Sequence, residues 1–120
     1  MKKIVFILLF SFVSLFAFEE LTMDNFNSKI KDKNVIVDFY ASWCPPCKIM
    51  AKSLEEFDVI DSSNVEIYKV NVDEEAVLTQ QFGIKQLPTI IFFKNGKPVK
   101  KFVGVLTPEE LSKASKEYFK

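Results

Sequence analysis

The sequence of 120 residues contains no histidine and only two cysteines. Without histidine, the chain cannot assemble a Ser-His or Cys-His nucleophile or a histidine metal site. Net charge is also absent, because 16 basic residues balance 16 acidic ones. This balance gives no electrostatic reason to expect a nucleic-acid partner. The length and the 48% hydrophobic content suit one domain with a proper core.

The N-terminus differs in composition from the rest of the chain. Met1, Lys2 and Lys3 precede an uncharged apolar run from Ile4 to Phe18. A basic start followed by a short apolar run is typical of a secretory signal peptide, and a membrane-spanning helix needs roughly 20 apolar residues. We therefore expect residues 1–17 to be a signal peptide, with Ala17 before the cleavage site, and residues 18–120 to form the domain. An uncleaved membrane anchor is the alternative.

Alternating strand and helix patterns follow. The segment Val35 to Tyr40 is β-rich and apolar on both faces except at Asp38, which predicts a central strand of a covered, parallel sheet. Other strands are expected at 65–72, 89–94 and 97–103, with a stub at 18–21. Helices are expected from Thr22 through Ile30, at 48–57, at 74–82 and from a cap at Thr107 to Tyr118. The order predicts an α/β fold with a mixed sheet of four strands, or five if the stub pairs, and helices on both faces.

The two cysteines stand in the segment Cys44-Pro45-Pro46-Cys47. A zinc site needs four ligands, and covalent haem attachment needs histidine where the chain has Lys48. A structural disulfide that closes so short a loop constrains the unfolded chain very little. Redox chemistry uses this spacing because the second thiol must reach the sulfur that the first has attacked. The pair is therefore interpreted as a redox-active dithiol, with a structural disulfide as the alternative.

The cysteines are expected at a strand-to-helix turn, because proline suits the first turn of a helix. The helix dipole and free N–H groups would lower the pKa of the Cys44 thiol, which predicts Cys44 as the nucleophile. Cys47, one turn into the helix, is expected to be more shielded and to resolve the intermediate. Pro45 and Pro46 donate no N–H. We therefore expect the Cys44 thiolate to receive fewer hydrogen bonds, which favours the disulfide and makes the pair a reductant.

Several segments resemble the thioredoxin family. Trp43 to Lys48, preceded by Val37 to Ala41, is similar to the thioredoxin active-site segment. Five further segments resemble later parts of thioredoxins in the right order: residues 69–73, 82–84, 87–89, 93–97 and 103–104. The resemblance covers about residues 20–119. It implies a thioredoxin fold and a monomeric thiol–disulfide oxidoreductase that acts on protein disulfides without metal, nucleotide or flavin.

The resemblance also implies roles for single residues. Asp38 resembles the buried acid that helps to deprotonate the resolving cysteine, although an Asp at a sheet edge is the alternative. Lys69 resembles the lysine that pairs with this acid, although an exposed strand lysine is common. Pro88 resembles a cis-proline that faces the dithiol and leaves the Leu87 backbone free to pair with an extended substrate.

A flat substrate-binding surface around the dithiol is implied at Trp43, Pro45, Pro46, Gly83, Ile84, Leu87 and Gly104. Two positions depart from the family pattern. Pro45 stands where glycine is typical, and Lys52 stands where a proline usually kinks the helix.

The expected function is that of a periplasmic thioredoxin, or one anchored to the inner membrane, which reduces disulfides of extracytoplasmic proteins. Export would separate it from the cytosolic reductase, so a membrane electron donor is expected. The alternatives are an oxidant that introduces disulfides and a binding module whose thiols are incidental.

Overall fold

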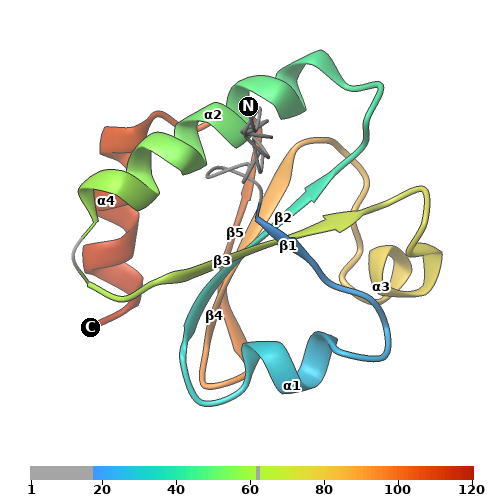
Figure 1. The fold of residues 1–120 in the computed structure, drawn as a ribbon, viewed down its shortest axis with the longest axis horizontal. Coiled ribbons are helices and arrows are strands. Elements are labelled where there is room, and N and C mark those ends of the chain that lie inside the picture. Colours follow the sequence, from blue (N-terminus) through green and yellow to red (C-terminus); the bar gives the residue numbers. More distant parts are fainter. Residues whose placement is uncertain (1–17, 62) are drawn as a thin grey trace, which may run out of the picture.

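The computed structural model describes residues 18–61 and 63–120 (Figure 1). The signal-peptide or anchor prediction for residues 1–17 lies outside the described residues. None of the described helices is both long enough and apolar enough to cross a membrane.

The described chain folds around one five-stranded mixed sheet in the order β1-β3-β2-β4-β5. The strands are β1 (Glu19–Glu20), β2 (Asn34–Tyr40), β3 (Glu66–Asn71), β4 (Thr89–Lys94) and β5 (Lys97–Val103). β1, β3 and β2 run parallel to one another, whereas β4 is antiparallel to β2 and β5 is antiparallel to β4. The expected α/β fold with a mixed sheet is confirmed, and the N-terminal stub does pair as its fifth strand.

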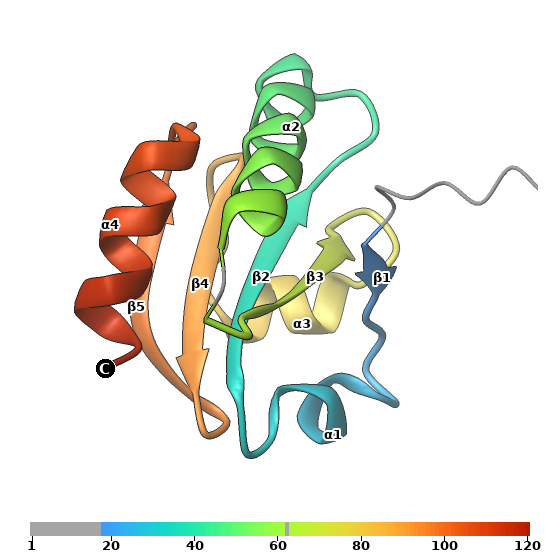
Figure 2. The same ribbon diagram turned by 60° about the vertical axis from the view of Figure 1, so that its left-hand side comes forward.

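Two helices cover each face of the sheet (Figure 2). The helices are α1 (Phe26–Ile30), α2 (Pro45–Ile60), α3 (Ala76–Gln81) and α4 (Pro108–Tyr118). Residues of α1 and α3 share one core cluster, and residues of α2 and α4 share the other.

Strand β2 divides its side chains between these two cores. Val35, Val37 and Phe39 belong to the core under α1 and α3, whereas Ile36 belongs to the core under α2 and α4. Successive residues of a strand point to opposite faces, so Asp38 points toward α2. This parity places a carboxyl group beneath the helix that begins at the cysteines.

One turn and one helix cap form as the sequence predicts. Asn95 and Gly96 join β4 to β5 with φ of 53° and 80°, as a tight hairpin turn requires. Thr107 caps α4, because its hydroxyl accepts a hydrogen bond of 3.1 Å from the backbone N–H of Glu110.

Two helix starts differ from the expectation. Thr22 does not cap α1: its own N–H donates to the Asn25 side chain at 2.7 Å, and the helix begins only at Phe26. The asparagine amide thus stabilises a turn before the helix. The helix expected from Glu74 begins at Ala76, because the N–H groups of Glu74 and Glu75 both donate to the carbonyl of Asn71 and form a turn.

Candidate active site

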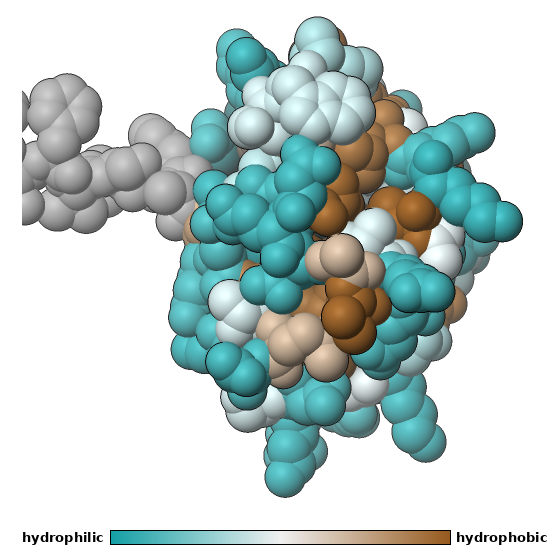
Figure 3. Space-filling view, turned by 90° about the vertical axis from the view of Figure 1, so that its right-hand side faces the viewer, coloured by the Kyte–Doolittle hydropathy of each residue, from teal (hydrophilic) through white to brown (hydrophobic). Residues whose placement is uncertain are grey.

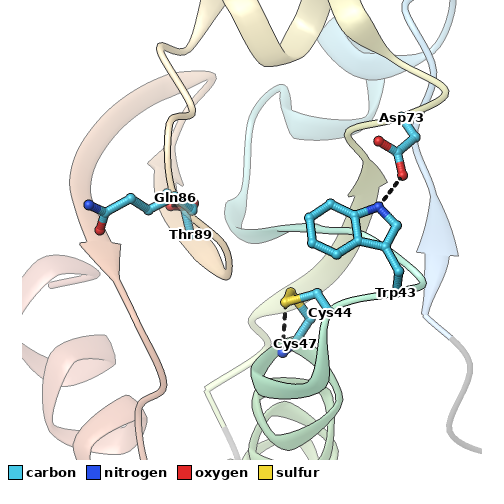
Figure 4. Close-up of a disulfide and its surroundings, with 6 residues drawn as sticks. All are labelled: Trp43, Cys44, Cys47, Asp73, Gln86 and Thr89. Carbon is cyan, nitrogen blue, oxygen red and sulfur yellow. Dashed lines mark hydrogen bonds between the residues drawn. A yellow bond between two sulfur atoms is a disulfide. The ribbon is translucent and has the colours of Figure 1, made fainter.

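The two cysteines form a disulfide where β2 passes into α2 (Figure 4). Cys44 is the N-cap of α2, and Pro45 and Pro46 are its first two residues. Cys47 therefore supplies the first N–H of the helix, which donates to the Cys44 sulfur over 3.3 Å. Strand β2 and helix α2 together fix both sulfurs at the carboxyl end of the parallel strands.

Both cysteines are buried in the disulfide form. Cys44 is 4% exposed and Cys47 is 3% exposed. They pack with Ala41 and with the half-buried side chains of Tyr40, Val72 and Leu87. In this form the two cysteines are buried to nearly the same extent.

Trp43 stands beside the disulfide and is 68% exposed (Figure 4). Its Nε1–H donates to the Asp73 carboxylate at 2.8 Å. Asp73 lies just after β3, at the same end of the sheet as the cysteines. The sequence did not predict a role for Asp73. Its position just after a strand that runs parallel to β2 was the feature that could have placed it near Trp43.

The segment before β4 reaches the disulfide from the other side. Leu87 contacts the cluster that contains both cysteines, and the Leu87–Pro88 peptide bond is cis. The Pro88 carbonyl accepts from the N–H of Gly104 at 2.9 Å. The Thr89 hydroxyl donates to the Gln86 carbonyl at 2.7 Å (Figure 4). These two hydrogen bonds hold the segment in place, and sequence reasoning missed Gln86 and Thr89.

The segment of residues 82–84, which holds two of the expected surface positions, follows α3. Gly83 is exposed and has a φ of 63°, a conformation that favours glycine. The Lys101 ammonium donates to the Phe82 carbonyl at 2.7 Å and ties this segment to β5. Ile84 is half-buried against the core under α1 and α3. Gly104 has a φ of 97° and follows β5 directly.

This end of the molecule presents a mixed surface. Figure 3 shows apolar side chains gathered at its centre and hydrophilic ones around them. Pro45 and Pro46 are exposed at the start of α2. The expected surface residues thus lie after β2, α3 and β5, before β4 and at the start of α2.

Asp38 lies in a cavity of about 250 Å³ beneath the disulfide. The cavity is lined by Asp38, Tyr40, Ala41, Ser42, Cys47, Lys48, Ala51 and Lys69. Asp38 is 3% exposed, and its Oδ1 atom has no hydrogen-bond partner among the described residues. Burial raises the pKa of this carboxyl to about 7, against a smaller lowering by the Lys69 charge. The cavity therefore brings a buried carboxyl and Cys47 together.

Lys69 is the neighbour of Asp38 across the β2–β3 register. Its ammonium, however, lies over the ring of Tyr40, 5.4 Å from the centroid. Within residues 18–61 and 63–120, the ion pair that closes within 4.0 Å is Lys29 with Glu19. Lys69 thus acts on Asp38 as a nearby charge without a contact ion pair.

The sequence of this chain is similar to those of known thioredoxins. The thioredoxin family model matches residues 17–117. A thioredoxin from Alicyclobacillus acidocaldarius is 49% identical over 92 residues, which cover 76% of this chain and 88% of that protein. A thioredoxin from Chlamydia caviae is 40% identical over 91 residues, with 76% and 88% covered.

Solved structures agree with the sequence comparison. The crystal structure of a Malassezia sympodialis thioredoxin superimposes with a TM-score of 0.75 at 35% identity, covering 85% of this chain and 90% of that one. A chloroplastic thioredoxin z superimposes with a TM-score of 0.77 at 29% identity, covering 85% and 94%.

Proposed function

The chain belongs to the thioredoxin family of thiol–disulfide oxidoreductases, and we propose that it reduces disulfides of extracytoplasmic proteins. The family acts on protein disulfides and needs no cofactor, because the redox group is the cysteine pair of the protein itself.

The reaction proceeds by two thiol–disulfide exchanges. The Cys44 thiolate attacks one sulfur of a substrate disulfide, forms a mixed disulfide and releases the other substrate sulfur as a thiolate. Cys47 loses its proton, attacks Cys44 Sγ and releases the second substrate thiolate. The substrate gains two electrons, and the Cys44–Cys47 disulfide forms. We assign the proton of Cys47 to Asp38, which lines the same cavity and has a pKa suited to proton exchange near neutrality.

Substrate binding is assigned to the segments that surround the disulfide. Leu87 packs against the cysteine cluster, and we assign its backbone to pairing with an extended substrate strand. Trp43 offers an exposed apolar ring beside the sulfurs. We propose that a monomer carries the complete site.

Pro46, the second residue of α2, is the basis of the proposed direction of electron flow. The side chain of an N-cap residue accepts hydrogen bonds from the second or third backbone N–H of its helix. Pro46 occupies the second position, so the N–H of Cys47 at the third is the capping donor to Cys44. A thiolate with few donors is less stabilised, and the reduced form is then the better electron donor.

Residues 1–17 support an extracytoplasmic location through their composition alone, with a basic start and a short apolar run. The proposed location is the same whether the protein is released into the periplasm or is held at the inner membrane by residues 1–17. In either case, the protein needs an electron donor that crosses or sits in the membrane.

The reduction potential of the Cys44–Cys47 pair tests the direction. We expect a value near the reducing, thioredoxin-like end of the range after equilibration with dithiothreitol or glutathione buffers. Pro46→Ala restores one donor to the thiolate, which contributes about 1.5–3 kcal/mol, and should raise the potential by roughly 30–65 mV. Pro45→Ala is the matched control, because a first-position N–H does not cap, and it should change the potential little.

Two results would contradict the proposal. A strongly oxidising potential in the unmodified protein would assign it to disulfide formation. Equal shifts in the two proline variants would remove the hydrogen-bond argument. Replacing both cysteines with serine should abolish the reduction of protein disulfides, whereas a redox-independent binding module would keep its biological role.

A further inference from the structure

Tyr40 crosses the sheet above Lys69. It is the last residue of β2, and its hydroxyl donates to the carboxylate of Glu20 on β1. Strand β3 lies between these two strands, and Glu20 is in register with Lys69 on β3. The tyrosine side chain therefore spans β3 at the position of Lys69, whose ammonium lies 5.4 Å from the ring centroid.

This position of Lys69 is not the one that charge alone would favour. Asp38 lies next to Lys69 in the register, and both side chains line the same cavity. A lysine side chain is long and flexible enough to place its ammonium on a neighbouring carboxylate. Here the ring face attracts the ammonium instead, and Asp38 Oδ1 is left without a hydrogen-bond partner among the described residues.

We infer that Tyr40 is a positioning residue that holds the Lys69 ammonium off Asp38 and so keeps the Asp38 carboxyl free to exchange the proton of Cys47. The inference rests on the role proposed above for Asp38. The tie to Glu20 fixes the ring in place. Burial and the Glu20 carboxylate raise the pKa of the Tyr40 hydroxyl, so the hydroxyl stays protonated and donates.

The groups that face Asp38 come from four elements. β2 supplies Tyr40, β3 supplies Lys69, and α2 supplies Cys47 and Lys48. β4 supplies the apolar Ile90 at the register position of Asp38. β1 acts only through Glu20, on the far side of Tyr40. Lys69 is therefore the cation whose position Tyr40 controls.

The test follows the Asp38 carboxyl carbon by NMR as a function of pH in the disulfide form, where neither cysteine titrates. We expect Tyr40→Leu to lower the titration midpoint by about one pH unit or more, since the freed ammonium would pair with the carboxylate. Lys69→Met should raise the midpoint. In the Lys69→Met background, Tyr40→Leu should have no further effect. Tyr40→Phe, which keeps the ring but loses the hydrogen bond to Glu20, should lower the midpoint less than Tyr40→Leu does.

An unchanged or raised midpoint in Tyr40→Leu would overturn the inference. A lowering that persists in the Lys69→Met background would overturn it as well, because Tyr40 would then act without Lys69. If Tyr40→Leu does not fold, Glu20→Ala releases the ring from an exposed strand edge. A lowering of the midpoint that requires Lys69 is the expected result there, and no lowering overturns the inference.

A second readout separates this inference from the role of Asp38. The pH profile of insulin disulfide reduction should lose the ionisation near neutrality in Asp38→Asn and should show it at lower pH in Tyr40→Leu. If Asp38→Asn leaves the profile unchanged, the role of Asp38 fails. If only Asp38→Asn alters the profile, the role of Asp38 stands and the positioning by Tyr40 fails.

Discussion

Asp38 makes the stability of this protein depend on pH in an unusual direction. The carboxyl is 3% exposed and has one oxygen without a partner among the described residues. Burial raises its pKa from 3.8 to about 7 in the folded protein. In the unfolded chain, the carboxyl is hydrated and keeps its ordinary pKa. The folded state therefore binds this proton more tightly than the unfolded state does.

The sign and size of the effect follow from this difference. Below about pH 3.8 the carboxyl is protonated in both states, and its contribution to stability is fully present. Between pH 3.8 and about 7 the unfolded state loses its proton first, so the free energy of unfolding falls as the pH rises. A shift of about three units corresponds to about 4 kcal/mol. Above pH 7 this penalty is complete and constant.

The prediction is checked with Asp38→Asn, a neutral variant of the same shape. The free energy of unfolding of the disulfide form is measured by guanidinium denaturation between pH 4 and pH 9. The variant should gain about 4 kcal/mol relative to the unmodified protein between the two ends of this range. Any constant offset reflects amide hydrogen bonding and does not matter. Parallel curves would refute the reasoning.

Three further predictions concern packing and capping. Asp73→Ala should free the indole of Trp43, the single tryptophan. The fluorescence anisotropy of Trp43 should then fall and the KM for protein disulfides should rise, whereas Glu74→Ala should change neither. Phe92→Ala removes a fully buried ring that packs against Phe102, Tyr118 and Phe119, and should cost about 3–5 kcal/mol in denaturant unfolding; a cost near that of the exposed Val99→Ala would contradict this packing. Thr107→Ala should cost about 1 kcal/mol through the lost α4 cap, and Thr107→Ser should restore most of it.

The features that the sequence predicts well depend on neighbouring residues. Asn95-Gly96 has its own preference for a tight turn, and Thr107-Pro108 has its own preference for a helix start. The helix that follows Cys44 is marked by two prolines that suit a first turn. Thr22 shows the limit of such signals: its hydroxyl suits a cap, but the Asn25 side chain accepts from the Thr22 N–H, and the helix begins only at Phe26.

The features that the sequence did not predict depend on partners that are far apart in the chain. Trp43 and Asp73 meet because β2 and β3 are parallel neighbours that end together. Lys69 was expected to pair with Asp38, and the register does bring them together. The competing attraction of the Tyr40 ring depends on Glu20, across a third strand. No local pattern reports a contact of that kind.

The two sulfurs are thus controlled from different sides. The Cys44 side is set by the backbone donors at the start of α2, where Pro46 removes one and Cys47 supplies another. The Cys47 side is set by a buried carboxyl whose nearest cation is held by a tyrosine. In the proposed mechanism, donors to the Cys44 thiolate stabilise the reduced protein and so determine the potential, whereas Asp38 accepts the proton that leaves Cys47. Changes at Pro46 should therefore move the potential and leave the midpoint of the Asp38 titration in place, and changes at Tyr40 should do the reverse.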